Sequence, residues 1–257
     1  MDPNPQFTII TSTLNSGLTL ERCLRSVAAQ THPDFEHLIV DGASIDHTLA
    51  LVEHYQSRYP LRLACSQPDS GLYQAWNRGV EQARGEWILF LGSDDMLYTC
   101  DVLKQVSSLL PLESDIAFLY GETADAGKLS AKWLNFDSKY WHNRLRGTTE
   151  FPNSVFIRRS VYDRGLRYNE SYKICADHDF FARADFWRHS LYISSPLISF
   201  SMGGVSTSKK YSFLHYLERK RMLNGLGMPR PTWSEWYYCI RALLAQDLSI
   251  LFSQSRK

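Results

Sequence analysis

Two adjacent carboxylates, Asp94 and Asp95, stand directly after Ser93 and close behind the most apolar run of the chain, residues 87–91. Neighbouring carboxylates repel each other unless a cation or hydrogen-bond donors neutralise them. A hard divalent ion such as Mg²⁺ or Mn²⁺ meets this need, because it binds one or two carboxylates together with phosphate oxygens. An exposed Asp-Asp turn that caps the following helix is the alternative, and the pair by itself leaves both open.

Strand and helix signals alternate through the first hundred residues, which predicts an α/β domain with a parallel sheet covered by helices. Polar residues gather where the predicted strands end, at Thr11–Asn15, Asp41–Asp46 and Ser93–Asp95. In open parallel sheets ligands bind outside the carboxyl ends of the strands, so the three clusters indicate one site. The predicted strands are 7–11, 37–40, 61–65 and 87–91, and the predicted helices follow Thr19, begin near 46 and span 72–83.

The second half of the chain is less regular. A helix over 102–109 and strands over 116–120, 155–158 and 192–200 indicate a mixed arrangement, and residues 121–150 suit a loop-rich acceptor-binding region. We therefore expect one domain over 1–205, with a regular half at about 1–96 and a less regular half at about 97–205. Residues 206–257 form a separate tail.

Charge is distributed unevenly along the 257 residues. The whole chain has a net charge of +1, yet residues 206–257 contain nine Lys or Arg against three Asp or Glu, a net of +6. The remaining body has a net of −5. A basic tail on an acidic body predicts contact of the tail with an anionic surface such as lipid. Nothing in the composition indicates a nucleic acid partner.

The five cysteines are scattered and form no CxxC pair, so neither a disulfide framework nor a zinc site is indicated. The first residues carry neither the basic region nor the apolar run of a signal peptide. No uncharged stretch of about 18 residues is present, which argues against a spanning helix. We therefore expect a cytoplasmic protein, with peripheral contact to the inner face of the cell membrane as a possibility raised by the tail.

Several ordered motifs run through the first hundred residues. Residues 69–79 fit D-x-G-x-Y-x-A-x-N-x-G, and residues 83–95 fit A-x-G-x-(W/Y)-(I/L)-x-F-L-x-S-D-D. Together with residues 11–15, 24–31 and 40–48, they resemble, in the correct order, the motifs of family 2 glycosyltransferases of the GT-A fold. By this resemblance, residues 1–205 are expected to be the GT-A catalytic domain, with a nucleotide-binding half at about 1–96 and an acceptor half at about 97–205. The resemblance is dense over 7–96 and thin to about 200. It implies a Rossmann-like, mostly parallel sheet flanked by helices, and a nucleotide-diphosphate sugar as donor.

The resemblance also assigns a nucleotide pocket. Thr11, Asn15 and Asp41 are expected to line it, with Asp41 accepting a hydrogen bond from the base. A buried carboxylate that accepts a hydrogen bond from a base N–H discriminates strongly between nucleotide bases, because the wrong base leaves the carboxylate unpaired. Asp69 and Arg78 are further pocket residues by the same comparison. The alternative for Asp41 is a structural role in the turn before Gly42, and the alternative for Arg78 is a solvent-exposed side chain without a role in binding.

By the same resemblance, Asp94 lies near the ribose or the sugar, and Asp95 is the principal ligand of Mn²⁺ or Mg²⁺, with Asp94 as a second ligand. The ion would stabilise negative charge growing on the leaving diphosphate. Truncation of Asp95 is therefore expected to cost catalysis more than folding.

Residues 176–183 resemble the family segment (E/A)-D-x-(D/E)-(L/F)-x-x-R, whose first Asp is the proposed base. Asp177 is thus expected to accept the proton of the acceptor hydroxyl, at a helix N-terminus that favours the ionised carboxylate. Attack opposite the diphosphate would invert the anomeric centre. Asp177 could instead simply cap the helix, and Asp179 is expected to pair with Arg183.

One stretch departs from the family pattern. Family members often carry His-Gln before the strand that precedes the base, whereas this chain has Pro152 and Asn153 there. Pro152 cannot donate what a histidine would. The donor or acceptor recognition that this histidine provides in the family is therefore not expected here, except for the part that Asn153 could replace.

The tail contains two predicted helices, over 211–223 and 233–252. The second bears an apolar face rich in aromatic residues, which either packs on the catalytic domain or lies in a membrane surface as a monotopic anchor.

The resemblance implies a glycosyltransferase of bacterial capsule, O-antigen or exopolysaccharide synthesis, with a UDP-sugar donor and a saccharide or lipid-linked acceptor. A non-catalytic nucleotide-sugar binding or scaffold subunit is one alternative. A sugar-nucleotide nucleotidyltransferase is another, but it needs a glycine-rich phosphate loop that residues 12–17 do not supply.

Overall fold

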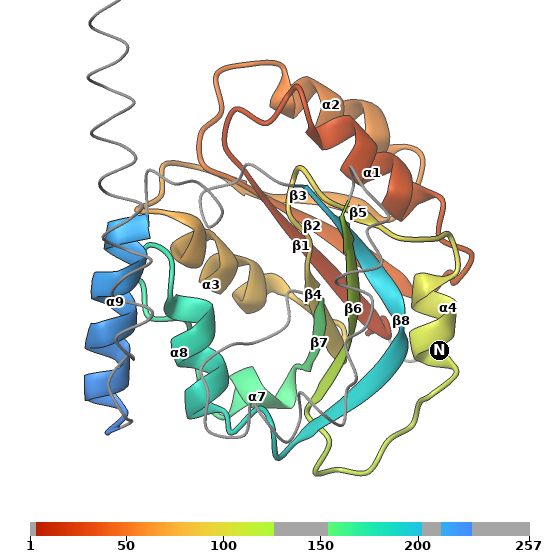
Figure 1. Ribbon diagram of the computed structural model, residues 1–257. Coiled ribbons are helices and arrows are strands. Elements are labelled where there is room, and N and C mark those ends of the chain that lie inside the picture. Colours follow the sequence, from red (N-terminus) through yellow and green to blue (C-terminus); the bar gives the residue numbers. More distant parts are fainter. Residues whose placement is uncertain (1–3, 126–153, 202–211, 228–257) are drawn as a thin grey trace, which may run out of the picture.

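The computed structural model describes residues 4–125, 154–201 and 212–227 (Figure 1). Within these ranges one mixed sheet has the strand order β3-β2-β1-β4-β7-β6-β8-β5. Its strands are β1 (Phe7–Thr13), β2 (Phe35–Asp41), β3 (Leu61–Ser66), β4 (Trp87–Phe90), β5 (Met96–Leu97), β6 (Phe118–Asp125), β7 (Val155–Arg158) and β8 (Ser190–Phe200). The helices are α1 (Leu20–Ala28), α2 (Thr48–Gln56), α3 (Leu72–Gln82), α4 (Val102–Ser107), α7 (Ser160–Asp163), α8 (Ala176–Arg183) and α9 (Ser212–Gly225).

The first four strands in the order β3-β2-β1-β4 are all parallel, as expected for strands joined through helices. Beyond β4 the sheet changes character: β7 runs antiparallel to β4 and β6, whereas β6 and β8 are parallel. The two-residue strand β5 closes the far edge against β8. The sheet is therefore a parallel half joined to a mixed half.

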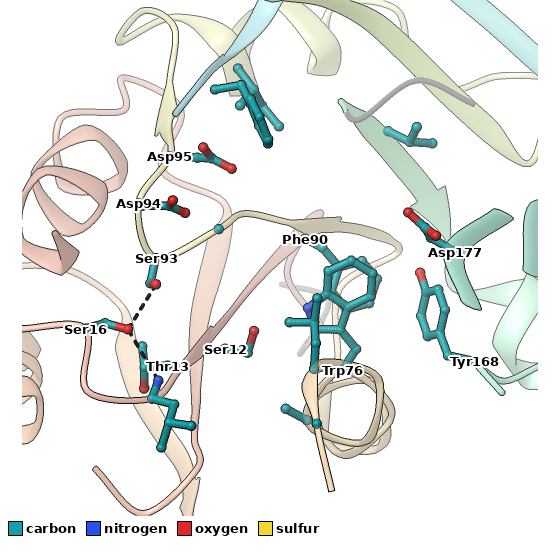
Figure 2. A pocket seen from close by; sticks show the side chains of 18 of the residues that line it. Ser12, Thr13, Ser16, Trp76, Phe90, Ser93, Asp94, Asp95, Tyr168 and Asp177 are labelled. Carbon is teal, nitrogen blue, oxygen red and sulfur yellow. Dashed lines mark hydrogen bonds between the residues drawn. The ribbon is translucent and has the colours of Figure 1, made fainter. Parts of the chain in front are cut away.

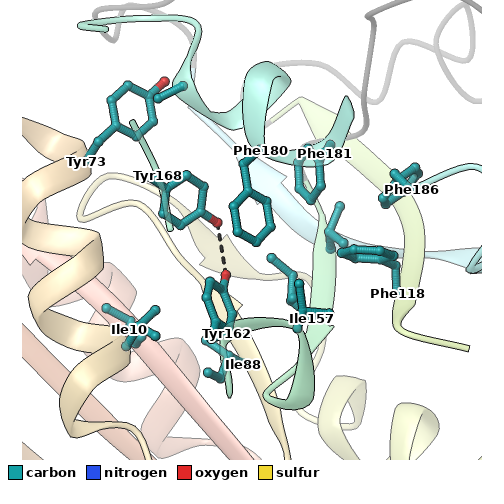
Figure 3. Close-up of a cluster of buried hydrophobic side chains, with 14 of the residues drawn as sticks. Ile10, Tyr73, Ile88, Phe118, Ile157, Tyr162, Tyr168, Phe180, Phe181 and Phe186 are labelled. Atoms are coloured by element: carbon teal, nitrogen blue, oxygen red, sulfur yellow. Dashed lines mark hydrogen bonds between the residues drawn. The ribbon is translucent and has the colours of Figure 1, made fainter. Parts of the chain in front are cut away.

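Helices cover both faces of the sheet (Figure 1). Successive side chains of a strand point to opposite faces of the sheet, so the strands contribute to two buried clusters. Ile9 packs with Leu24 of α1 in one cluster, and Ile10 lies in the other with residues from α3, α7, α8 and α9. Figure 3 shows the second cluster, where Tyr162 and Phe180 stack beneath the strands. Full burial of each such side chain stabilises the fold by about 1.5–3 kcal/mol.

The predicted elements are confirmed throughout the described first hundred residues, with ends shifted by a few residues. The sequence did not predict β5 or α7. A two-residue strand has no periodicity of its own; β5 exists because it pairs with β8 and because Leu97 N–H donates to Ser26 Oγ at 3.1 Å.

The predicted helix over 211–223 corresponds to α9. Most of the predicted 121–150 loop region, Pro152, Asn153 and the 233–252 helix lie outside the described residues, and the proposed division at residue 205 stays a prediction.

None of the helices among residues 4–125, 154–201 and 212–227 is long and apolar enough to cross a membrane. In the same ranges Cys23, Cys65, Cys100 and Cys175 are all free thiols, as their scattered spacing predicted.

Two glycines of the family motifs let elements approach closely. A Cβ at Gly79 of α3 would lie 2.7 Å from Ile10 Cγ2, so this helix packs directly on β1. A Cβ at Gly85 would lie 2.4 Å from the Thr8 backbone nitrogen, and Gly85 N–H donates to Thr8 Oγ1 at 2.8 Å. Gly85 thus lets the connection between α3 and β4 lie directly against the backbone of β1.

We predict that Gly85→Ala destabilises the protein by about 1–3 kcal/mol, because the methyl group meets rigid backbone of β1 and the strand must shift. Urea denaturation monitored by tryptophan fluorescence measures the change. Gly225→Ala is the matched control: its new Cβ has nothing within 4 Å, and the free energy of unfolding should change by less than about 1 kcal/mol. Equal losses for the two variants would contradict the close approach at Gly85.

Candidate active site

A pocket of about 480 Å³ opens beside the carboxyl ends of β1 and β4. Polar residues from the end of β1 and from the loops after β1 and β4 line one side of it, and Asp177 of α8 stands on the other side (Figure 2). The polar side comprises Ser12, Thr13, Ser16, Ser93, Asp94 and Asp95, and Asp69 from the loop after β3 also lines the pocket. Two of the three strand-end clusters expected from the sequence, those at 11–15 and 93–95, therefore contribute to one site, whereas no residue of the third, 41–46, lines the pocket.

The acid pair follows β4, where Gly92 makes room for it. A Cβ at Gly92 would lie 2.6 Å from Asp95 Oδ2 and 3.0 Å from Asp94 Oδ1. Both carboxylates thus occupy the space that a side chain at position 92 would need. Asp95 is 7% exposed, so one of the two charges is largely removed from water.

The end of β8 and a cation on α1 hold the acid pair in place. Ser201 N–H donates to Asp95 Oδ1 at 2.8 Å. Arg22 donates through Nη2 to the Asp94 carbonyl and, at 2.6 Å, to Ser201 Oγ. The pair is therefore fixed by residues about 70 positions before and 106 positions after it in the chain. Neither Arg22 nor Ser201 was predicted from the sequence.

Burial raises the pKa of Asp95 to about 6, and the negative charge of Asp94 adds to this rise, while the Ser201 N–H and Arg22 oppose it. An ionised Asp95 beside Asp94 concentrates negative charge that a cation would stabilise. Carboxylate oxygens are the ligands that Mg²⁺ and Mn²⁺ prefer, so the donor set fits such an ion. No third His, Cys, Asp or Glu joins them in the part of the chain that the structure describes, and the remaining ligands would come from phosphate and water.

Asp41, expected to face the nucleotide base, is not among the residues that line the pocket. Its carboxylate is fully buried and accepts hydrogen bonds from Thr13 Oγ1, Ser66 Oγ, and both the N–H and the hydroxyl of Ser44, at 2.5–2.9 Å. Burial raises its pKa, but these bonds outweigh burial and leave the pKa lowered. Asp41 ties together the ends of β1, β2 and β3, which supports the structural alternative considered for it.

Three other expected pocket residues also lie elsewhere. Thr11 is fully buried and points away from the pocket, with its hydroxyl 3.0 Å from His37 Nε2. Asn15 is exposed and accepts a bond from Ile45 N–H, which fixes the loop after β1. Arg78 donates to the carbonyl groups of Gln67 and Pro68. These side chains shape the loops around the pocket and do not line it.

Asp69 does line the pocket, as expected. Its Oδ1 accepts the N–H of Gly71 at 3.0 Å, and a Cβ at Gly42 would lie 2.9 Å from its Oδ2. Asp69 therefore rests against the loop that follows β2, and it places a carboxylate beside the strand ends. Of the expected pocket residues outside the acid pair, Asp69 keeps its place at the site.

Asp177 lies in the first turn of α8, with its carboxylate on the pocket (Figure 2). Its Oδ1 accepts the N–H of His178 at 2.8 Å and the hydroxyl of Tyr73 at 3.2 Å. Burial and the nearby Asp177 charge raise the pKa of Tyr73, so its hydroxyl stays a donor. The expected ion pair of the same helix is present: Arg183 Nη2 lies 2.7 Å from Asp179 Oδ2.

An aromatic wall defined by Trp76, Phe90 and Tyr168 lies between the acid pair and Asp177 (Figure 2). Trp76 stacks on Phe90 with ring centroids 4.4 Å apart, and Tyr168 meets both rings edge-on. The sequence did not predict this wall as part of the site, although Trp76 stands inside the motif at 69–79 and Phe90 inside the motif at 83–95.

Comparison with known proteins agrees with this arrangement. The model of Glycosyl transferase family 2 matches residues 8–164. A PGL/p-HBAD biosynthesis glycosyltransferase of Mycobacterium bovis is 35% identical over 180 residues, which are 68% of each chain. An uncharacterized glycosyltransferase of Mycobacterium tuberculosis is 26% identical over 226 residues, which are 82% of this chain and 81% of that one.

Two solved structures share the fold. S. aureus TarS in complex with UDP-GlcNAc aligns with a TM-score of 0.65 at 20% identity, covering 93% of this chain and 71% of that chain. The mannosyltransferase PcManGT from Pyrobaculum calidifontis, in complex with GDP-Man and Mn²⁺, aligns with a TM-score of 0.67 at 14% identity, covering 94% and 69%. The architecture is that of GT-A enzymes. The chain belongs to glycosyltransferase family 2, which confirms the resemblance of its motifs.

We predict that Asp95→Asn changes how stability depends on pH. Because the folded pKa of about 6 exceeds the ordinary 3.8, the folded state keeps a proton that the unfolded chain has lost, and wild-type stability falls as pH rises through this interval. The asparagine lacks this titration. Without divalent ions, the variant should therefore gain up to about 3 kcal/mol relative to wild type between about pH 4 and about pH 7.

Urea denaturation at the two pH values measures this gain. Asp163→Asn, at an exposed position of α7, controls for the loss of a surface carboxylate. A stability difference between Asp95→Asn and wild type that does not change with pH would contradict the burial of Asp95.

Proposed function

We propose that the protein transfers a sugar from a nucleotide-diphosphate sugar, most simply a UDP-sugar, to an acceptor hydroxyl, with inversion at the anomeric carbon. The observation that carries this proposal is the position of Asp177 across the pocket from the acid pair at the end of β4. A donor whose diphosphate lies at the acid pair would present the opposite side of its sugar to Asp177. That placement suits direct displacement, which inverts the reacting carbon.

Asp94 and Asp95 would hold Mn²⁺ or Mg²⁺, which supplies positive charge to the departing diphosphate. Asp94 and Asp69 both line the pocket and would border the donor on its nucleotide side. The complexes of PcManGT with GDP-Man and Mn²⁺ and of TarS with UDP-GlcNAc support a donor and an ion of this kind.

Asp177 would remove the proton of the acceptor hydroxyl as that oxygen attacks the sugar. Its Oδ1 is engaged by Tyr73 and by the His178 N–H, which orients the carboxylate. A base has to lie within hydrogen-bond reach of the proton that it accepts, so this fixed orientation suits general-base catalysis. Asp177 also lies at the start of α8, and a capping role and a catalytic role are compatible.

The acceptor would be a saccharide, or a saccharide linked to a lipid, bound along the aromatic wall. Flat aromatic faces suit sugar or aryl rings, because they offer large apolar area with little conformational entropy to lose. The similar mycobacterial protein is named for PGL/p-HBAD biosynthesis, which supports a biosynthetic glycosyltransferase. We further propose that the basic tail, residues 206–257, contacts the membrane surface where such an acceptor would lie.

The donor is tested by thermal-shift measurements with UDP-glucose, UDP-GlcNAc, GDP-mannose and dTDP-glucose, each with and without Mn²⁺. Binding to the native state raises its apparent stability, so the correct donor should raise the Tm most, and more with Mn²⁺ than without it. Release of nucleoside diphosphate from that donor, with water as acceptor, then separates an enzyme from a non-catalytic scaffold subunit. Binding without any release, in the presence of Mn²⁺, would favour the scaffold.

We predict that Asp177→Asn lowers the kcat of this release at least about 100-fold, because general-base catalysis contributes roughly 10²–10⁴-fold. Donor binding should survive, since the acid pair on the other side of the pocket is untouched. The thermal shift by donor and Mn²⁺ checks binding, and a coupled nucleotide assay checks turnover. Asp163→Asn, remote from the pocket on α7, is the matched control and should retain wild-type turnover. Undiminished turnover in Asp177→Asn would exclude Asp177 as the base.

A further inference from the structure

One buried carboxylate of α9 binds the segment that leads into α8. Glu218 is 7% exposed. Its Oε1 accepts the N–H of Lys173 at 2.8 Å, and its Oε2 accepts those of Ile174 at 2.8 Å and Cys175 at 3.1 Å. Three consecutive backbone donors therefore converge on one side chain that lies more than 40 residues further along the chain.

These three hydrogen bonds lie directly before the first turn of α8. The first N–H groups of a helix and of its lead-in have no partner within the helix, and a carboxylate satisfies them while it also interacts favourably with the helix dipole. Such charge-assisted bonds are stronger than neutral ones. Since Cys175 is the residue before α8, its backbone position fixes where Asp177, two residues later, projects.

The same segment is held from the opposite side by α3. The hydroxyl of Tyr73 donates to the Ile174 carbonyl at 2.5 Å and to Asp177 Oδ1 at 3.2 Å. Ile174 thus has its N–H bound by Glu218 and its carbonyl bound by Tyr73. The backbone before Asp177 is thus hydrogen-bonded to both α9 and α3, and the Tyr73 hydroxyl also bonds to the carboxylate of Asp177.

The anchoring helix is itself well fixed. Met222 and Leu223 of α9 are 1% and 5% exposed and belong to the core cluster shared with α3 and α8. Arg221 donates to Ser171 Oγ at 3.1 Å and lies over the ring of Tyr172, 5.0 Å from its centroid. Figure 1 shows α9 alongside α8. A rigidly packed helix therefore presents Glu218 to the loop.

We infer that Glu218 is a positioning residue for Asp177: through the three N–H groups of residues 173–175 it sets the place from which this carboxylate reaches the pocket. The inference rests on the proposed role of Asp177 as the base. It gives α9, which lies beyond the 8–164 span of the family match, a part in the reaction. Small displacements of a base are costly, since a misplacement of about 1 Å can lower a rate about 100-fold.

The test compares Glu218→Gln with Met222→Ala in the full chain. A glutamine keeps the shape but turns one acceptor oxygen into an N–H donor, which opposes at least one of the three backbone donors. Met222→Ala loosens the packing of α9 and leaves those bonds in place. Both variants should lower the Tm, so a role in stability alone would affect them alike.

We expect Glu218→Gln to lower kcat for nucleoside diphosphate release, from the donor of the thermal-shift panel with water as acceptor, by about 10- to 100-fold. KM for the donor should stay within about twofold of wild type, because the acid pair is distant from α9. Met222→Ala should keep kcat within about twofold, and Glu53→Gln, an exposed glutamate of α2, should match wild type. Hydrogen exchange should show the amides of 173–175 protected in wild type and in Met222→Ala, and faster in Glu218→Gln.

Equal losses of kcat in Glu218→Gln and Met222→Ala would overturn the inference, as would unprotected amides at 173–175 in the wild type. If Asp177→Asn is inactive while Glu218→Gln has wild-type kcat, the positioning role fails and the base stands. If Asp177→Asn is fully active, the proposed base fails and the inference with it. Should Glu218→Gln not fold, Glu218→Asp replaces it: the shorter acid reaches fewer donors, and wild-type kcat together with lost amide protection would contradict the inference.

Discussion

Two carboxylates forced together at the end of β4 impose the main physical constraint on this molecule. Asp95 is almost removed from water, its pKa is raised to about 6, and Asp94 lies beside it. Separating these charges would be easy in a flexible loop. Instead, Gly92, Arg22 and the backbone of Ser201 keep them together. Such an arrangement costs stability in the metal-free protein and becomes favourable when a cation and a diphosphate share the site.

The rest of the fold can be understood as holding other groups at a fixed place relative to that pair. The parallel half of the sheet contributes strand-end loops and Asp69. The mixed half contributes β8, whose end contacts Asp95, and it also contributes the connections to α8 and Asp177. The pocket therefore lies where the two halves meet, with the aromatic wall between its two acidic ends. The proposed inverting transfer would use this separation, because the acceptor oxygen would attack the sugar carbon from the side opposite the leaving diphosphate.

Much of this was predictable from sequence, for physical reasons. The order of elements follows from hydrophobic periodicity, and the acid pair, Asp69 and Asp177 stand at strand or helix ends where the fold requires them to meet. Thr11 lies off the pocket because residues 7 and 9 of β1 face α1, and the alternation of side chains along a strand puts Thr11 on the same side. Asp41 lies off the pocket as well: a motif records that a carboxylate is required, and does not distinguish a ligand contact from four internal hydrogen bonds.

Other features had no local signal. Arg22, Ser201 and Glu218 act on backbone groups far away in the sequence, and such contacts depend on tertiary packing that neither spacing nor composition encodes. The residues that hold catalytic groups are therefore harder to predict than the groups themselves.

The central claim is that the acid pair binds a divalent ion together with a diphosphate. Isothermal titration calorimetry of the full chain with UDP, at neutral pH and with or without Mn²⁺, tests it most directly. Wild type should bind UDP at least about tenfold more tightly with Mn²⁺, a difference of about 1.4 kcal/mol, and Asp95→Ala should show no such gain. UDP affinity that is the same with and without Mn²⁺ in the wild type, or a manganese effect that persists in Asp95→Ala, would contradict the account.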